Sequence, residues 1–164
     1  MPTHVIFYDP GKVTGWGIYG EHGCTMSGQG TLRQVLAETI PWIKLNEPPI
    51  VGVEKTFVGP GKRASLDVTE DLGFIKGALW CAGYRGEIFM PVKGSWMSAL
   101  SLLDWAEGPD GKKVRPTDDE LEERALAHAR ALVEVNLTKA QIHQAEGICG
   151  SQVTWERWLE RAAA

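Results

Sequence analysis

Short apolar runs separated by turn residues open the chain and predict a three-stranded meander. The first run, residues 3–8, is rich in β-branched and aromatic side chains, and the turn signal Asp9-Pro10-Gly11-Lys12 follows it directly. Two further strands are expected over residues 14–19 and 24–30, the latter weaker because it contains several small residues. This pattern places Asp9 at the end of the first strand.

Apolar positions at helical spacing follow the meander and alternate with two more strands. Thr31 is expected to cap a helix that Pro41 kinks or ends. Residues 50–54 are apolar up to the final glutamate, which is typical of a strand buried on both faces in a mixed or parallel sheet. A helix over residues 65–82 and a strand over residues 87–92 then complete a β-α-β unit.

The last third of the chain is predicted to be mainly helical. A short helix is expected over residues 95–104 and a loop over residues 108–113. The segment Thr117-Asp118-Asp119-Glu120 has the form of a capping box, for a helix that runs to about residue 135. A final helix is expected over residues 138–159. This order of elements predicts an α/β fold and one domain over residues 1–164, because a chain of this length builds one core of ordinary size.

The composition fits a globular protein and excludes several other classes. Hydrophobic residues make up 43% and charged residues 23% of the chain, close to the average of globular domains. No apolar run approaches the roughly 20 residues that cross a bilayer, and the first residues lack the pattern of a secretory signal. We therefore expect a cytoplasmic protein with no membrane partner. The three cysteines are odd in number and far apart, which argues against a disulfide framework or a zinc site.

The charge is acidic overall but uneven along the chain. A net charge of −4 argues mildly against a nucleic-acid partner. Residues 1–54 carry 3 basic and 5 acidic side chains, residues 55–115 carry 9 and 7, and residues 116–164 carry 5 and 9. Because the middle segment is net positive, the distribution of charge matters more than its total.

Two acidic residues lie where predicted strands end. Asp9 closes the first strand and Glu54 closes the fourth, and a carboxylate at the edge of an apolar strand must be solvated, paired or bound to a cation. Each also has an ordinary explanation, since aspartate before Pro-Gly is good turn chemistry and a glutamate at a strand end is often solvated. If the two strands are adjacent, however, these like charges repel unless a cation neutralises them.

The last predicted helix carries a second polar pair. His143 and Glu146 are three residues apart and so share a face, beside Gly147 and Gly150, which allow close approach to another backbone. Taken separately, the histidine would more often be a half-buried residue with satisfied hydrogen bonds, and the glutamate a solvated surface residue. The combination with the strand-end carboxylates is what points to a site.

Together, three carboxylates and an imidazole make a ligand set for divalent cations. Hard oxygen ligands select Mg²⁺ or Mn²⁺, and Mn²⁺ tolerates a single imidazole well. Four such groups can hold two ions about 3.5–4 Å apart, the arrangement that activates a water and stabilises the leaving oxygen in phosphodiester hydrolysis. The sequence therefore predicts a nuclease site with two metal ions.

The motifs around these residues resemble the RuvC-type Holliday-junction resolvases. The run Val-Ile-Phe-Tyr-Asp9-Pro10-Gly11 with Thr14-Gly15-Trp16-Gly17 is similar to their first hairpin, and Glu54-Lys55-Thr56-Phe57 looks like their second acidic strand. The similarity continues through the helix around residues 73–77, the strand end at Val92-Lys93 and the terminal helix, and it reaches about residue 155.

The resemblance implies a ribonuclease-H-like fold, a five-stranded mixed sheet flanked by helices on both sides. It also implies a homodimer whose two active sites cut opposed strands of a four-way DNA junction. By the motif match, Asp9, Glu54, His143 and Glu146 are the metal-binding catalytic residues. Glu146 stands where most members have an aspartate, and its extra methylene group bears on metal position and metal preference.

Further positions match DNA contacts of the family. Lys93 matches a basic catalytic residue, where a cation holds the scissile phosphate or eases transition-state charge; a solvated lysine is the alternative. Phe57 resembles an aromatic that reaches the junction centre, with a core phenylalanine as the alternative. The remaining expected phosphate contacts, which could equally be solvated loop charges, are Lys62, Arg63, Lys112, Lys113 and Arg115.

Three other functions stay open on the sequence alone. A nuclease of the same fold acting on other branched DNA or on RNA–DNA substrates is one, because fold and metal site do not set the substrate. A nucleotide-binding relative of the actin-like ATPases is another, although those proteins need two such domains. The third is a non-catalytic junction-binding module, against which the presence of all four candidate ligands argues.

Overall fold

The computed structural model of the protein describes residues 4–55 and 64–164. Its main strands are β1 (His4–Asp9), β2 (Thr14–Gly20), β3 (Gly23–Gly30), β4 (Ile50–Val53) and β5 (Glu87–Phe89). They form one sheet in the order β3-β2-β1-β4-β5. Strand β2 is antiparallel to both of its neighbours, whereas β4 is parallel to both β1 and β5. The predicted five-stranded mixed sheet is confirmed.

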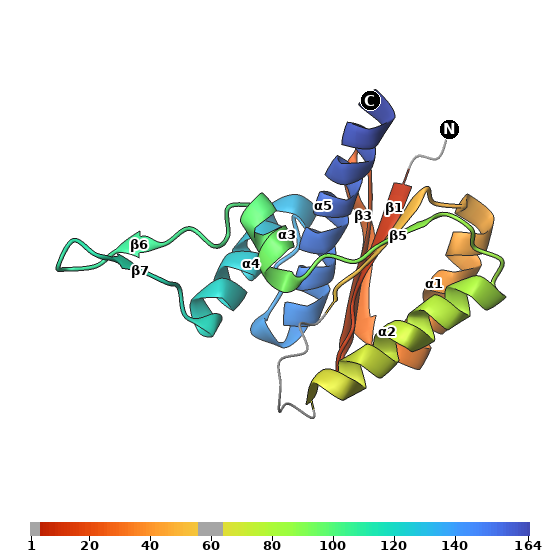
Figure 1. Ribbon diagram of the computed structural model, residues 1–164, viewed down its shortest axis with the longest axis horizontal. Helices are drawn as coiled ribbons and strands as arrows, with labels where there is room; N and C mark the ends of the chain where they lie inside the picture. Colours follow the sequence, from red (N-terminus) through yellow and green to blue (C-terminus); the bar gives the residue numbers. More distant parts are fainter. Residues whose placement is uncertain (1–3, 56–63) are drawn as a thin grey trace.

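Helices cover both faces of this sheet, as Figure 1 shows. One layer contains α1 (Leu32–Asn46) and α2 (Ala64–Cys81), and the other contains α3 (Lys93–Ala99), α4 (Asp118–Val133) and α5 (Ile142–Ala163). A 3₁₀ turn, Lys139–Gln141, leads into α5. Within the described residues, no helix combines the length and the apolar character that a membrane span requires.

Alternating side chains of β1 pack against the helices on opposite faces of the sheet. Ile6 and Tyr8 pack in the cluster formed with α1 and α2, and Phe7 packs in the cluster formed with α3, α4 and α5. Because successive strand residues point to opposite faces, Asp9 follows Phe7 to the α5 side of the sheet. Strand β1 therefore places the Asp9 carboxylate beneath α5.

The first helix continues through Pro41 to Asn46, so the proline does not end it. A proline inside a helix costs about 3 kcal/mol or more, since it removes one hydrogen bond and crowds the preceding turn. Ile43, which is only 2% exposed, offsets much of this, because burying such a side chain stabilises by about 1.5–3 kcal/mol. The helix ends instead where Glu47 adopts a left-handed conformation, just before Pro48.

The segment between α3 and α4 also differs from the prediction. The helix expected over residues 95–104 begins at Lys93 and ends at Ala99. The expected loop is the turn of a small hairpin, β6 (Ala106–Glu107) with β7 (Lys113–Val114), which extends away from the sheet in Figure 1. Strands of two residues are too short to leave a periodic signal in the sequence.

Glycines bring α5 and β2 unusually close together. A Cβ at Gly15 would overlap the main chain of His143, and one at Gly17 would lie 2.8 Å from the carbonyl oxygen of Gly147. From the other side, a Cβ at Gly147 would meet the Trp16 main chain and one at Gly150 the Phe7 ring. The predicted role of the two helix glycines is confirmed, and the contact fixes the start of α5 above the sheet.

Candidate active site

Asp9 and Glu54 lie at the same edge of the sheet. Asp9 is the last residue of β1, and Glu54 directly follows the parallel strand β4. The strands remain in register up to Tyr8 and Val53, and the Glu54 N–H donates to the Tyr8 carbonyl at 2.9 Å. The predicted adjacency of the first and fourth strands is confirmed.

The first two turns of α5 bring His143 and Glu146 to Asp9. His143 Nδ1 lies 3.3 Å from Asp9 Oδ2. Asp9, His143 and Glu146 each offer one ligand atom, and these atoms lie within 4.8 Å of one another. Both carboxylate residues are 4% exposed, whereas the imidazole is half-buried. Three of the four predicted ligands thus form one cluster.

Glu54 lies beside this cluster and has a partner of its own. Its Oε2 accepts a hydrogen bond from Trp96 Nε1 at 2.7 Å, and Trp96 is fully buried in α3. Glu54 is therefore not part of the three-atom cluster, although its charge is near enough to raise the pKa of Asp9. The indole fixes this carboxylate next to the other ligands.

Burial and crowding raise the pKa values of both strand-end carboxyls. The pKa of Asp9 stands well above its ordinary range, first because of burial and then because of the charges of Glu54 and Glu146. Burial also raises the pKa of Glu54 to about 7, against the Trp96 hydrogen bond, which lowers it. Ionising both carboxyls here is costly unless a cation compensates them.

Lys93 supplies a positive charge from the start of α3. Its Nζ donates to Glu146 Oε1 at 2.6 Å, and its side chain is 43% exposed. Burial lowers the pKa of Lys93, but attraction to Glu146, Glu54 and Asp9 outweighs burial, so the pKa is raised and the ammonium group stays charged. The lysine lies where the sequence placed it, next to the candidate ligands.

A groove opens beside Lys93, between α3 and α4. It has a volume of about 420 Å³, and its lining includes Lys93 and Arg115 together with Asp118 and Glu122. Arg115 therefore lines the same groove as Lys93. Asp118 and Glu122 on α4 repel an anion, so the groove attracts an anion only next to Lys93 and Arg115.

The other basic candidates of this region lie on the hairpin. Lys112 and Lys113 are exposed on or next to β7, and Lys112 Nζ is 3.7 Å from Asp110 Oδ2. The hairpin carries Glu107 and Asp110 as well as the two lysines, so its formal net charge is zero. Phe57, Lys62 and Arg63, the other candidate DNA contacts, lie outside the described residues.

Two solved structures match almost the whole chain. RuvC from T. thermophilus in complex with a Holliday junction substrate matches with a TM-score of 0.62 at 15% sequence identity, over 99% of this chain and 98% of that one. A second Thermus thermophilus RuvC structure gives a TM-score of 0.60 at 16% identity, over 97% of this chain and 96% of that one. The chain has the RuvC fold.

The RuvC fold confirms the resemblance that the sequence motifs indicated. No protein-family model and no curated protein sequence matches the chain. At 15–16% identity the likeness establishes the ribonuclease-H-like architecture of RuvC and its nearly full-length extent. The assignment of chemistry has to come from the residues of the cluster themselves.

Within the RuvC fold, the cluster fits a divalent cation. Two carboxylate oxygens and an imidazole nitrogen are donors that Mg²⁺ and especially Mn²⁺ accept, and their atoms lie within 4.8 Å of one another. Two of the donors are buried carboxyl groups with few compensating charges, and His143 keeps the cluster in contact with solvent. Donor type, spacing and charge therefore agree.

The sequence alone missed two residues that support the cluster. Trp96 holds Glu54 through its indole N–H; its place three residues after Lys93 on the same helix was the available signal. Gln29, on the edge strand β3, binds the main chain around His143. No local pattern marks Gln29, because its role depends on the register of β3 against α5.

Proposed function

We propose that this protein is a metal-dependent DNA endonuclease that resolves four-way junctions. The observation that carries the proposal is the cluster of Asp9, His143 and Glu146 at the end of the central strand. A structure with the same fold, RuvC from T. thermophilus, was solved in complex with a Holliday junction substrate. The cluster supplies the chemistry, and the neighbour suggests the substrate.

In this proposal the four candidate ligands share two divalent ions. Asp9, His143 and Glu146, whose ligand atoms lie within 4.8 Å of one another, would hold one ion, and Glu54, at the end of the neighbouring strand β4, would help to hold the second. Divalent ions at such a site lower the pKa of a water and stabilise the leaving oxygen of a phosphodiester. Mg²⁺ and Mn²⁺ both suit the ligands.

Neighbouring residues orient one of the ligands and supply a positive charge to the site. Trp96 holds Glu54 in one orientation through a 2.7 Å hydrogen bond. Lys93 keeps its proton and balances Glu146 while the site is free of substrate, and it then offers the same ammonium group to the scissile phosphate. The buried strand ends keep bulk water away from Asp9.

Contacts to the rest of the junction come from basic residues around the site. Arg115 extends the cationic end of the groove beside Lys93, and Lys112 and Lys113 follow on the hairpin. Contacts from Phe57, Lys62 and Arg63 remain predictions from the sequence.

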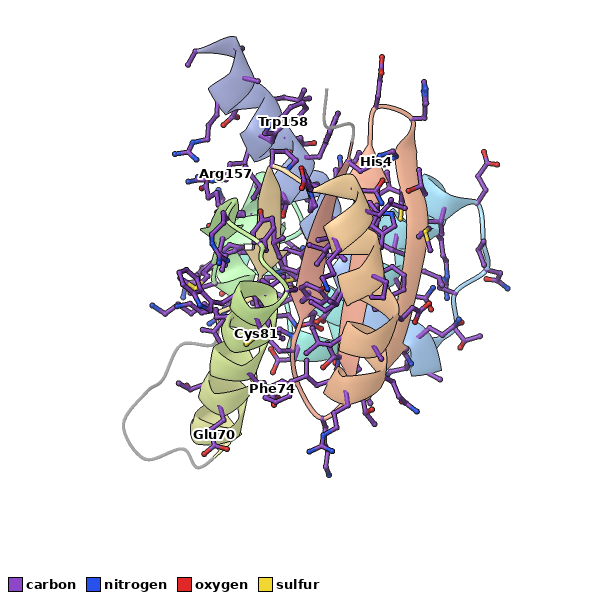
Figure 2. All side chains as sticks on the ribbon, turned by 90° about the vertical axis from the view of Figure 1, so that its right-hand side faces the viewer. His4, Glu70, Phe74, Cys81, Arg157 and Trp158 are labelled. Atoms are coloured by element: carbon purple, nitrogen blue, oxygen red, sulfur yellow. The ribbon has the colours of Figure 1, made fainter. Side chains whose placement is uncertain are left out.

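A homodimer forms part of this proposal, because a four-way junction presents two strands to be cut. The outer face of α2 is the surface we assign to the second copy: Phe74 is 52% and Trp80 66% exposed, and a Cβ at Gly77 would meet no atom within 4 Å. Figure 2 looks onto this side of the molecule, with Glu70 and Phe74 along α2.

The charges of α2 suit antiparallel pairing about a two-fold axis. Glu70 lies toward the N-terminal half of the helix, and the guanidinium of Arg85, just beyond its C-terminal end, stacks over Trp80 at 4.1 Å. Antiparallel pairing brings the acidic end of one copy to the basic end of the other. Phe74→Glu should convert a dimer to a monomer in light scattering, and an unchanged mass would remove α2 from the interface.

The decisive experiment for this function is cleavage of an immobile four-way junction in Mg²⁺ and in Mn²⁺. Paired nicks in opposed strands, absent with Asp9→Asn, are the expected result. Cutting of RNA–DNA hybrid but not of the junction would instead support a different nuclease of this fold. Tight junction binding without any cutting in either metal would support a non-catalytic module. A cytoplasmic location is the setting we propose for this activity.

A further inference from the structure

Asp9, Gly15 and Gln29 form a single row across three strands. Asp9 pairs with Gly15 in the ladder between β1 and β2, and Gly15 pairs with Gln29 in the ladder between β2 and β3. Directly paired residues of neighbouring strands point to the same face of a sheet. The whole row therefore faces α5.

Each member of this row contacts the chain around His143, at the start of α5 or in the 3₁₀ turn before it. Asp9 Oδ2 lies 3.3 Å from the ring of His143, and Gly15 lies against the His143 main chain with no room for a Cβ. Gln29 Nε2 donates to the Ala140 carbonyl at 2.8 Å, and Gln29 Oε1 accepts from the Gln144 N–H at 3.1 Å. One side chain thus binds the main chain on both sides of His143.

These bonds satisfy groups that the start of a helix leaves open. The first N–H groups of an α-helix have no partner within the helix, and Gln144 is the third residue of α5. The residue before α5, Gln141, makes no side-chain cap of its own there. Gln29 acts as a cap supplied from a separate strand, and the Gln144 side chain adds a 3.0 Å bond to Ser27 Oγ.

We propose that Gln29 is a positioning residue that holds His143 against Asp9 and thereby sets the geometry of the metal site. The metal part of this inference rests on the proposed function. Residues that orient a ligand without touching the metal typically change metal affinity by about 10–100-fold when they are removed. Gln29 does so through the main chain, so its loss displaces the imidazole but removes no ligand.

Two substitutions test this role with little change in packing. Gln29→Met keeps the size of the side chain and loses both hydrogen bonds, and Gln29→Asn keeps an amide that is too short to reach both partners. The matched control is Gln152→Ala, because Gln152 also lies on α5 and bonds to His128 and Glu156, away from the cluster. Thermal unfolding of all variants reports any general loosening.

The readouts are Mn²⁺ affinity by calorimetry, hydrogen exchange at the Gln144 amide and the NMR signals of the His143 ring in metal-free protein. We expect Gln29→Met to weaken Mn²⁺ binding about tenfold or more, to speed exchange at Gln144 and to shift the ring signals. Gln29→Asn should act in the same direction, and Gln152→Ala should change none of the three.

Unchanged ring signals in Gln29→Met, or equal effects from Gln152→Ala, would overturn the role of Gln29. If wild-type protein binds no Mn²⁺, the proposed function fails, and the two metal-free measurements still decide whether Gln29 positions His143. A shifted ring with full Mn²⁺ affinity would refute the claim that Gln29 sets the geometry of the metal site.

Discussion

Carboxylates at the two ends of α5 differ in burial and in the number of cations paired with them. Near its C-terminal end, Glu87 of β5 faces two guanidinium groups, Arg157 at 3.4 Å and Arg161, and its side chain is 26% exposed. Near its N-terminal end, Asp9 and Glu146 are almost fully buried, and the cation paired with Glu146 among the described residues is Lys93.

This difference separates a structural ion pair from a site for chemistry. The single negative charge of Glu87 is compensated by two guanidinium groups, so this carboxylate does not need a bound cation. The carboxyls at the other end resist ionisation, as the raised pKa values of Asp9 and Glu54 express, and they need an added cation to stay charged together. A deficit of compensating charge, and not the presence of acidic residues alone, distinguishes the candidate site.

The largest effect expected from breaking this comparison is on cleavage. Asp9→Asn removes one charge from the deficient end and a ligand from the cluster, and it should lower junction cleavage by about a thousandfold or more while junction binding persists. At pH values where Asp9 would otherwise ionise, the same substitution should stabilise the metal-free protein, because asparagine cannot carry the charge that repels Glu54 and Glu146. Gel-based cleavage and thermal unfolding measure the two effects.

The matched control is Glu87→Gln at the other end of α5. It should cut junctions at the wild-type rate, because Glu87 has its partners in Arg157 and Arg161. A fully active Asp9→Asn variant would contradict the assignment of Asp9, and an inactive but folded Glu87→Gln variant would contradict the comparison.

The next effect is a dependence of stability on pH and metal. A carboxyl whose folded pKa lies above its unfolded value binds more protons in the folded state, so stability falls as pH rises between the two values. For Glu54 this window runs from the ordinary range of glutamate to about 7, and Asp9 acts in the same direction. Metal-free protein should therefore lose stability as pH rises from the ordinary range of glutamate to about pH 7.

Mn²⁺ should reverse this loss, because it replaces the missing positive charge. At a metal concentration about 100 times the dissociation constant, binding contributes about 2.7 kcal/mol, or roughly 5–10 °C in melting temperature for a chain of this size. The rise should be larger at pH 8 than at pH 6. Scanning fluorimetry at both values measures it, and an equal rise at both would show that the ion binds elsewhere.

A smaller effect is expected at Lys93. Lys93→Ala should slow cleavage about tenfold or more and weaken junction binding less, because in the proposed function the ammonium group acts on the scissile phosphate. Lys93→Arg keeps the charge and should restore part of the rate. Single-turnover rates and junction affinities separate the two quantities, and equal losses in both would reduce Lys93 to a phosphate anchor.

The smallest effect concerns the stability contributed by the Glu87 pair. Because these side chains are partly exposed, Glu87→Gln should lower the free energy of unfolding by less than about 1 kcal/mol. Urea unfolding measures this change. A loss of several kcal/mol would mean that the ion pair supports the fold far more than its exposure suggests.

Sequence patterns predicted most of the helices and strands and most of the cluster, and the family resemblance implied the five-stranded sheet. Asp9 and Glu54 could be paired in advance because both end apolar strands, and the ends of neighbouring parallel strands meet at one edge. His143 and Glu146 could be placed together because residues three apart share a helix face. These predictions depend only on the periodicity of single elements and one assumed strand pairing.

What could not be predicted depends on contacts between distant elements. The bond from Trp96 to Glu54 and those from Gln29 to the main chain beside His143 join residues 42 or more positions apart. The continuation of α1 through Pro41 likewise follows from the burial of Ile43 against the core. Local propensity carries no information about such tertiary contacts.

The most direct test of the central claim is a crystal structure of the protein soaked in Mn²⁺, with anomalous scattering recorded for the metal. We expect an anomalous peak within coordination distance of Asp9, His143 and Glu146, at the end of β1. Crystals with no peak there, from protein that still cuts junctions in Mn²⁺, would contradict it.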